Sequence, residues 1–278
     1  MDWDLSVSSK HKILDLKLRE LIHYRDLIAM FFWRDFVTTY KQTILGPLWH
    51  ILSPLASTFV YAFAFGNIAK IGTDGIPFLL FYYGGTMLWT FFSTCLNTAS
   101  NIFLTNYDVF GKVYFPRLSV PIATTFSALF KSLIQFVMLM CFLVYFILTG
   151  NPVRPTYYAF LFPLMLVWIG ALGTGMGMIF SALTTKYRDL NHVLNLSLQL
   201  MMYLTPVVYP LSQVPQKLKL FFYFNPMSAP VELFRIWFYG FGNVPAKMIL
   251  ASLISTFFIL FIGLVLFTKV SRTFMDII

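Results

Sequence analysis

Long runs of hydrophobic residues, separated by short polar segments, dominate the chain. A helix that crosses the hydrocarbon core of a bilayer needs roughly 20 mostly apolar residues. The segments that meet this requirement are 47–69, 77–104, 119–148, 157–183, 193–209 and 248–267, so six membrane-spanning helices are predicted. Continuous apolar runs argue against a β-barrel, whose strands alternate apolar and polar positions. We therefore expect an all-α membrane protein.

Residues 12–46 precede the first predicted span and have a helical pattern that is too polar to cross a membrane. The longest apolar run in this segment, 27–33, is bracketed by charged residues. Such a helix is expected to lie along the cytoplasmic interface, with Phe31, Phe32 and Trp33 in the headgroup layer. Part of it could instead face another protein.

The segment 205–246 lies between the last two predicted spans and contains six prolines. Its apolar runs, 220–224 and 236–241, are too short to cross a bilayer. Irregular backbone at membrane depth is tolerated only inside protein or along a water-filled cavity. We therefore predict re-entrant helices that dip back from the outer face. The alternative is an ordinary outer loop with an interfacial helix.

The composition agrees with a lipid environment. Hydrophobic residues make up 58% of the chain and charged residues 11%, whereas soluble domains average about 25% charged residues. A single membrane domain is therefore expected to account for residues 1–278. The two cysteines, Cys95 and Cys141, lie in apolar runs without neighbouring metal ligands, so they predict neither a disulfide nor a metal site.

The net charge of +9 comes from basic residues that flank the predicted spans. On one side of the membrane lie thirteen Lys and Arg residues, and on the other side five. The positive-inside rule then places both termini in the cytoplasm. Since membrane orientation explains these charges, no nucleic-acid partner is expected.

Several kinds of chemistry are missing from the sequence. The only Gly-Lys pair, Gly111-Lys112, is followed by Val113, so there is no Walker A motif to hold ATP phosphates. Any ATP and Mg²⁺ would bind a partner subunit, and no cofactor is expected on this chain. The predicted spans lack the acidic residues that proton- or sodium-coupled carriers use. No histidine pair or acidic cluster predicts a catalytic or metal site.

Five short motifs occur in a characteristic order. They are YKQTILGPLW at 40–49 followed by Ser53-Pro54, KVYFPR at 112–117, YRDL at 187–190, TPVVYP at 205–210 followed by Val214-Pro215, and Asn225-Pro226 followed by Glu232 and Arg235. Each motif alone is weak. Together they resemble the permease subunits of type-2 ABC transporters that export O-antigen, capsule or wall teichoic acid.

This resemblance implies a bacterial inner-membrane exporter of a lipid-linked polysaccharide, such as an O-antigen-like glycan on polyprenyl pyrophosphate. It further implies a homodimer of the permease with two copies of a cytoplasmic ABC ATPase. Alternative cargoes are wall teichoic acid, capsule, or a small amphiphile or drug. Two other functions remain open: a membrane-embedded enzyme acting on polyprenyl lipids, and a channel without energy input.

The resemblance also suggests candidate residues on the cytoplasmic side. Those expected to contact the ATPase are Tyr107, Asp108, Lys112, Arg117, Arg188 and Asp189. The alternative is that they are solvated loop charges. Arg34, Lys41 and His50 are candidates for the entrance of the lipid pyrophosphate, because cations form strong charge-assisted bonds to phosphate. Attraction to anionic lipid headgroups would explain the two basic residues equally well.

Further candidates lie deeper in the membrane or at its outer face. Asn225, Pro226, Glu232 and Arg235 are predicted to form an outer gate, with the last two on one helical face. The alternative is a solvent-exposed ion pair of little energetic weight. Aromatic rings can hold sugars loosely, and the candidates for a glycan channel are Tyr61, Phe65, Tyr82, Trp89, Phe92 and Tyr203. Packing or interface belts are the alternative for each ring.

Two features of the predicted spans have no assigned chemistry. Gly173 and Gly177, in a GxxxG pattern, predict a close approach of the fourth span to another helix. Lys131 in the third span could extend toward the cytoplasmic surface or line a water-filled path. The sequence leaves both interpretations of Lys131 open.

Overall fold

The computed structural model describes residues 18–41, 46–112, 115–185, 187 and 189–277. Throughout these residues the regular structure is helical, as predicted, and no strand occurs in them. The α-helices are α1 (Leu18–His23), α2 (Arg25–Tyr40), α3 (Trp49–Tyr61), α4 (Phe78–Ser100), α5 (Ile102–Thr105), α6 (Tyr107–Phe110), α7 (Ser119–Leu148), α8 (Phe162–Thr184), α9 (Leu190–Tyr203), α10 (Gln216–Phe224), α11 (Ser228–Tyr239) and α12 (Ala246–Ile277). Short 3₁₀ turns are η1 (Gly46–Leu48), η3 (Tyr157–Leu161) and η4 (Leu211–Gln213), and a π-helical segment, η2 (Ala62–Ile68), continues α3.

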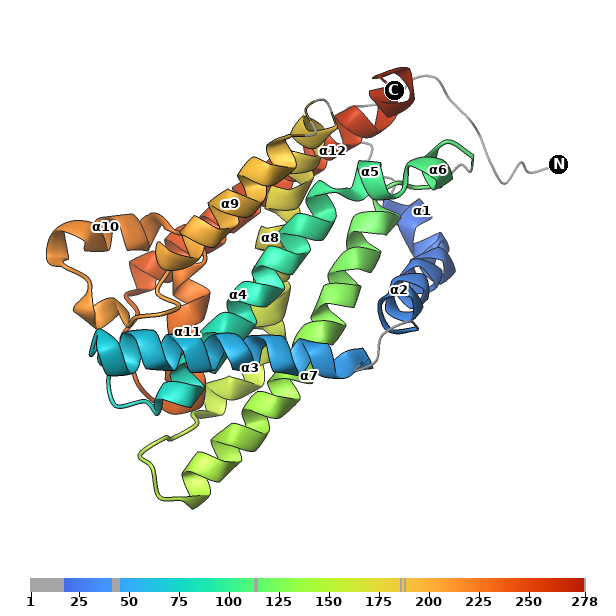
Figure 1. The fold of residues 1–278 in the computed structure, drawn as a ribbon. Coiled ribbons are helices and arrows are strands. Elements are labelled where there is room, and N and C mark those ends of the chain that lie inside the picture. Colours follow the sequence, from blue (N-terminus) through green and yellow to red (C-terminus); the bar gives the residue numbers. More distant parts are fainter. Residues whose placement is uncertain (1–17, 42–45, 113–114, 186, 188, 278) are drawn as a thin grey trace.

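The helices α4, α7, α8 and α12 form the centre of a tilted bundle (Figure 1). Glycines let α8 approach its neighbours closely. A Cβ on Gly177 would lie 2.5 Å from the Ala99 Cβ on α4, and one on Gly263 of α12 would meet the Gly175 carbonyl. The predicted close approach of the glycine-rich span is therefore confirmed, and its physical basis is backbone packing.

Among the described residues, four helical segments are long and apolar enough to cross a membrane. They are Trp49–Ile68, Ser119–Leu148, Tyr157–Thr184 and Ala246–Ser271. The uncharged α4 has 23 residues but is rich in hydroxyl, glycine and aromatic side chains, which lower its hydropathy. It is also largely buried in the bundle, where it does not have to face lipid.

The structure corrects several predicted boundaries. The fifth predicted span, 193–209, is too long at its end, because α9 stops at Tyr203 ahead of Pro206. With 14 residues, α9 is about 21 Å long, less than the roughly 30 Å of a hydrocarbon core. The second predicted helix, 77–104, is interrupted at Asn101, after which α5 begins at Ile102.

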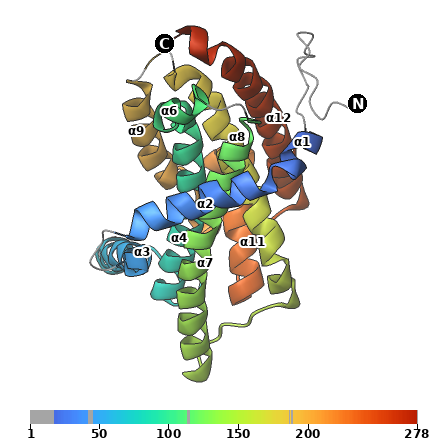
Figure 2. The ribbon, with the colours of Figure 1, turned by 90° about the vertical axis from the view of Figure 1, so that its right-hand side faces the viewer.

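The N-terminal helix is also interrupted and lies across the bundle. Residues 12–17 and 42–45 of the predicted segment fall outside the described residues, and Tyr24 separates α1 from α2. Figure 2 shows α2 crossing α7. The Phe31 ring is buried, with its centroid 5.6 Å from that of Phe115. The Phe31 ring therefore packs against protein and does not face lipid, whereas Trp33 is 62% exposed.

The segment 205–246 folds into η4, α10 and α11 at the opposite end from the C-terminus (Figure 1). The Ser212 hydroxyl donates to the Asp74 carboxylate, and the Gln213 side chain donates to the Gly72 carbonyl at 3.0 Å. These bonds fasten η4 to the loop before α4. Gly240, with a φ of 79° that favours glycine, ends α11.

Candidate functional site

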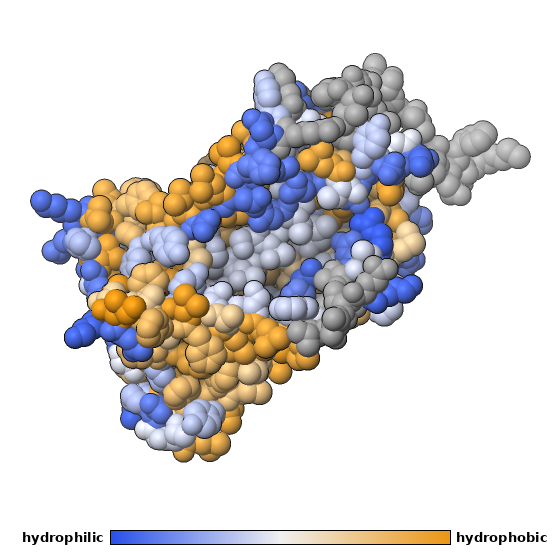
Figure 3. All heavy atoms as spheres, in the orientation of Figure 1, coloured by the Kyte–Doolittle hydropathy of each residue, from blue (hydrophilic) through white to orange (hydrophobic). Residues whose placement is uncertain are grey.

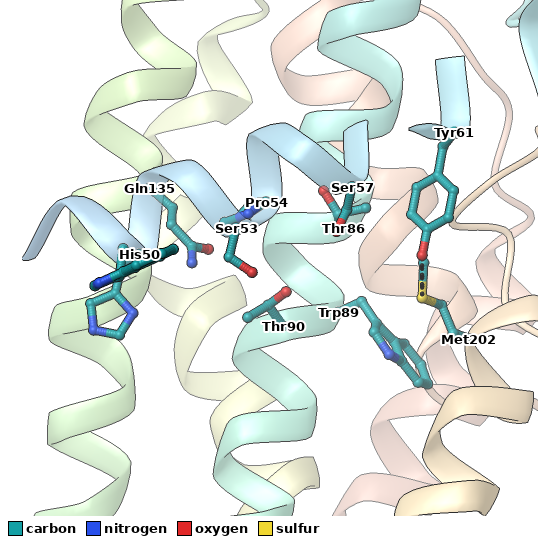
Figure 4. Close-up of a pocket in the computed structure, with 11 residues that line it drawn as sticks. His50, Ser53, Pro54, Ser57, Tyr61, Thr86, Trp89, Thr90, Gln135 and Met202 are labelled. Atoms are coloured by element: carbon teal, nitrogen blue, oxygen red, sulfur yellow. Dashed lines mark hydrogen bonds between the residues drawn. The ribbon is translucent and has the colours of Figure 1, made fainter. Parts of the chain in front are cut away.

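The surface is hollowed between α3 and α9. In Figure 3 the floor of this hollow has intermediate hydropathy, while apolar side chains cover α3 on its near edge. The hollow contains a cavity of about 150 Å³, which we call the central groove. Its lining residues are Trp49, His50, Ser53, Pro54, Ser57, Tyr61, Thr86, Trp89, Thr90, Gln135 and Met202. Figure 4 shows these side chains converging from α3, α4, α7 and α9.

Threonines spaced one helical turn apart give α4 its polar face. Thr86 and Thr90 line the central groove, and Thr94 and Thr98 continue the same face toward the C-terminal end of α4. Their spacing of four residues keeps them on one side of the helix. The Thr86 hydroxyl donates to the Tyr82 carbonyl at 2.8 Å, so its oxygen can still accept a bond from a ligand hydroxyl.

A second cavity lies between α2, α4 and α7, and we call it the lysine pocket. Its volume is about 440 Å³. The lining residues are Arg34, Asp35, Thr38, Thr94, Thr98, Thr124, Ser127, Ala128 and Lys131. Thr90 and Thr94 are one turn apart on α4, as are Gln135 and Lys131 on α7. The two cavities are thus neighbours along the same pair of helices.

The helix α9 borders the hollow with a polar stripe. His192, Asn195, Gln199 and Tyr203 recur every three or four residues and are exposed. Figure 3 shows hydrophilic surface along the edge of the hollow where α9 lies. Exposing these polar side chains to lipid would cost free energy. It is therefore suited to an aqueous wall.

The predicted channel aromatics separate into two groups. Tyr61 and Trp89 line the central groove, and the Tyr61 hydroxyl donates to the Met202 sulfur at 3.8 Å (Figure 4). Tyr203 is 41% exposed on α9. Tyr82 and Phe92, in contrast, are buried in the core, and half-buried Phe65 packs against it. Those three rings lie away from the groove wall because they pack within the protomer.

Glu232 and Arg235, the predicted outer pair, are each only 3% exposed. The Arg235 guanidinium bonds to Glu232 at 2.5 Å, donates to the Val207 carbonyl at 3.1 Å and lies 3.9 Å above the Phe81 ring. Glu232 also accepts the Leu211 backbone N–H at 3.3 Å. The interpretation as a solvent-exposed pair was therefore wrong. The pair ties α11 to the turn after α9 and to α4.

We call the residues from 205 to the end of α11 at Tyr239 the outer assembly, and Asn225 and Pro226 belong to it. The Asn225 amide donates to the Leu204 carbonyl at 3.1 Å and to the Thr205 hydroxyl at 2.9 Å, and its oxygen accepts the Met227 N–H. The Pro226 carbonyl accepts the Ser252 hydroxyl of α12. These side chains hold α10, α11 and α12 around the end of α9.

Comparison with known proteins identifies the family of the chain. The profile of a family described as ABC-2 type transporter matches residues 26–239, which include the helices around the groove and the outer assembly. The chain belongs to this family. It is therefore the membrane-embedded permease of an ABC transporter and not an enzyme, and its ATPase is a separate subunit.

Individual relatives of the permease are named for polysaccharide export. The chain is 25% identical over 268 residues to the O-antigen export system permease protein RfbA of Klebsiella pneumoniae, covering 95% of this chain and 100% of the relative. It is 29% identical over 225 residues to RfbA of Myxococcus xanthus, covering 80% and 84%. It is also 25% identical over 211 residues to the polysialic acid transport protein KpsM of Escherichia coli, covering 75% and 79%. The resemblance seen in the sequence motifs is confirmed.

The candidate ATPase contacts of the permease gather at one end of the bundle. Tyr107 and Asp108 are exposed on α6, and Asp189 is exposed just before α9. Figures 1 and 2 place α6 at the end where the C-terminus lies. Lys112 is exposed, and the Arg117 guanidinium lies 5.6 Å from the Phe110 ring centroid. Arg188 lies outside the described residues.

The three predicted entrance residues of the permease do not share one site. Arg34 lines the lysine pocket, whereas His50 lines the central groove. Lys41 is exposed after α2 and is absent from the lining of both cavities.

Sequence reasoning missed the hydroxyl-bearing face of α4 and the pocket that Lys131 lines together with Arg34 and Asp35. The signal was the recurrence of threonine at 86, 90, 94 and 98, which is detectable as a period of four. Within the described residues, no group of three His, Cys, Asp or Glu side chains is placed to hold a metal ion.

Proposed function

We propose that this permease exports a lipid-linked polysaccharide, of the O-antigen type on polyprenyl pyrophosphate, across the bacterial cytoplasmic membrane. A separate ABC ATPase, binding ATP and Mg²⁺, supplies the energy. The observation that carries the proposal is the central groove, which combines hydroxyl groups and aromatic faces in a family member related to O-antigen export permeases. The KpsM relative supports a capsule-like glycan as the second candidate cargo.

The lining of the groove suits a sliding sugar chain. Sugars have apolar faces that pack on rings such as Trp89 and hydroxyl edges that bond to groups such as Thr90 and Gln135. Apart from His50, every side chain around the cavity is uncharged and either hydroxyl-bearing, amide, aromatic or apolar. Weak neutral contacts let a polymer advance, whereas a deep charged site would stall it.

The topology that we propose has six spans, with both termini in the cytoplasm. The uncharged α4 and the short α9 add two spans to the four long apolar helices. The helices α10 and α11 are re-entrant. Burial of the Glu232–Arg235 pair and of Phe234 supports this assignment, because a helix of an ordinary outer loop would leave such charges in water. The excess of basic residues on the α6 side supports the orientation.

We further propose a homodimer in which the hollow faces a second copy. Only 11% of the residues in the apolar window of Trp49–Ile68 are buried within the chain, and Phe59 and Phe63 are exposed in this segment. The polar stripe on α9 borders the same hollow. A second copy would enclose the stripe around a water-filled path and cover the apolar face of α3.

In this arrangement α6 and the residues before α9 contact the ATPase. Support comes from exposed Tyr107, Asp108 and Asp189 at one end of the bundle, close to the C-terminal end of α4 and the start of α9. Movement at that end would reach the groove directly through α4 and α9.

Reconstitution tests the proposed function. The permease and its ATPase are placed in proteoliposomes with a glycan on a prenyl diphosphate, and protected glycan is measured after ATP addition. We expect ATP-dependent translocation that requires both subunits. Uphill movement by the permease alone, or no translocation by the complex, would refute the proposal.

Cysteine accessibility tests the groove itself. In a Cys141→Ala background, in which buried Cys95 remains, Ser53→Cys and Thr90→Cys should react with a water-soluble maleimide. Val137→Cys, on an exposed apolar face of α7, is the matched lipid-facing control and should stay unlabelled. Equal labelling of all three variants would exclude a water-filled groove.

A further inference from the structure

Lys131 is the only charged residue of α7, which otherwise has the composition of a membrane span. It is partly buried at the wall of the lysine pocket. A cation at this depth requires compensation by an anion or by water. The partners available to Lys131 therefore decide what the pocket is for.

The protein itself supplies little compensation to Lys131. Of the described carboxylates, none forms an ion pair with it within 4.0 Å. Asp35 acts on it at longer range, but that carboxylate is already bonded to Arg34 at 2.8 Å. His50, across in the central groove, is also within electrostatic range of Lys131 and adds no negative charge. Arg34, Asp35 and Lys131 together leave the pocket with one net positive charge.

The hydroxyl groups of the lysine pocket add neutral donors. Ser127 is 9% exposed, and its hydroxyl is buried without a hydrogen-bond partner. Thr124, one turn before it, and Thr94 and Thr98 on α4 line the same cavity. A buried hydroxyl without a partner is uncommon in a folded protein. A ligand with several acceptor oxygens would satisfy it.

The level of the pocket also constrains the ligand. The Phe36 ring of α2 packs edge-on against Phe130, with centroids 5.3 Å apart, so α2 crosses α7 beside Lys131 (Figure 2). The four charged residues of α2 favour the membrane surface over the hydrocarbon core, where each charge would be costly. The cavity, about 440 Å³, is therefore within reach of the headgroup of a lipid in the cytoplasmic leaflet.

We infer that the lysine pocket binds the phosphoryl headgroup of a membrane lipid, with Lys131 and Arg34 as cations and Ser127 and Thr124 as hydroxyl donors. Phosphate oxygens would give Lys131 the negative charge, and Ser127 the acceptor, with which neither is bonded in the pocket. The inference rests on the proposed function in so far as the lipid is the prenyl diphosphate carrier of the glycan. An anionic phospholipid offers the same chemistry, so the experiment must distinguish the two.

The test uses the complete permease–ATPase complex in phosphatidylcholine nanodiscs, with farnesyl diphosphate as the probe. We expect Lys131→Met to weaken probe binding at least about tenfold, the effect of losing one charge-assisted bond. Lys131→Arg should largely restore it. Lys217→Met, which removes an exposed lysine from α10, is the matched control and should bind like the wild type. Thermal unfolding without the probe checks that each variant is folded.

The outcomes separate the two lipid sources. If phosphatidylglycerol does not displace farnesyl diphosphate, the ligand of the pocket is the prenyl diphosphate carrier of the glycan. If the two lipids compete equally, the ligand is bulk anionic phospholipid. A folded Lys131→Met variant that binds both lipids like the wild type overturns the inference, as does absence of binding to either by the wild type. Should Lys131→Met fail to fold, Ser127→Ala provides the same comparison with a smaller expected loss. Glycan translocation by the wild-type complex is measured separately, so failure of the pocket and failure of the export proposal remain distinct.

Discussion

The buried Glu232–Arg235 pair gives a quantitative prediction for stability. Removing one partner of a buried ion pair leaves an isolated charge and costs about 3–5 kcal/mol, whereas replacing both partners by uncharged residues is often close to neutral. Glu232→Gln and Arg235→Met are therefore each expected to be strongly destabilising. The double variant loses the bonds to Val207 and the stacking on Phe81 but keeps no uncompensated charge.

For a chain of this length, roughly 2–4 °C of melting temperature corresponds to 1 kcal/mol. Each single variant should thus melt about 6–20 °C below the wild type, measured by intrinsic fluorescence in detergent. The double variant should recover most of this loss. A double-mutant cycle gives the coupling energy directly. If the double variant loses as much as the sum of the single variants, the two side chains are independent and the ion pair does not act as a unit in tying α11 to the turn after α9.

Three further outcomes are expected. Gly177→Ala should lower the melting temperature, because its Cβ would lie 2.5 Å from the neighbouring backbone and overpacking costs about 1–3 kcal/mol. Gly170→Ala is the control and should leave the melting temperature unchanged, since the nearest atom to its Cβ is 3.4 Å away. Equal effects of the two variants would contradict the packing argument. Thr90→Leu should slow glycan translocation several-fold at unchanged melting temperature, since it removes a hydroxyl from the groove wall; a normal rate would exclude that wall from the path. Asp108→Lys should reduce co-purification of the ATPase without loss of stability, whereas Lys219→Glu at the outer end should leave co-purification unchanged. Retention of the ATPase by both variants would show that α6 does not form the contact.

The helical fold class was predictable because each helix must satisfy its own backbone groups in lipid, so its apolar length is visible in the sequence. The exact ends of the helices were less predictable. The end of α9 at Tyr203 and the break at Asn101 depend on how the following residues pack, and the apolar pattern continues through both positions. The burial of Phe31 was not predictable for a similar reason, because it depends on Phe115, a neighbour that is distant in sequence.

The candidate site was predictable in part. Asn225, Pro226, Glu232 and Arg235 were found through the family resemblance, but their burial and their bonds to the turn after α9 were not foreseeable from spacing. Tyr61 and Trp89 reach the groove while Phe92 does not. All three have the same apparent suitability for sugar binding, and only the rotation of each helix in the bundle distinguishes them.

By itself the sequence determined that the protein is a bundle of apolar helices, that it has no nucleotide-binding motif of its own and that its family is that of ABC exporter permeases. Those properties follow from composition, segment length and short motifs, each of which is local along the chain. Only the tertiary structure decided which polar groups share a cavity. Lys131 and Arg34 are far apart in sequence, and they line one pocket because α2 packs across α7, a contact between side chains that no local pattern encodes.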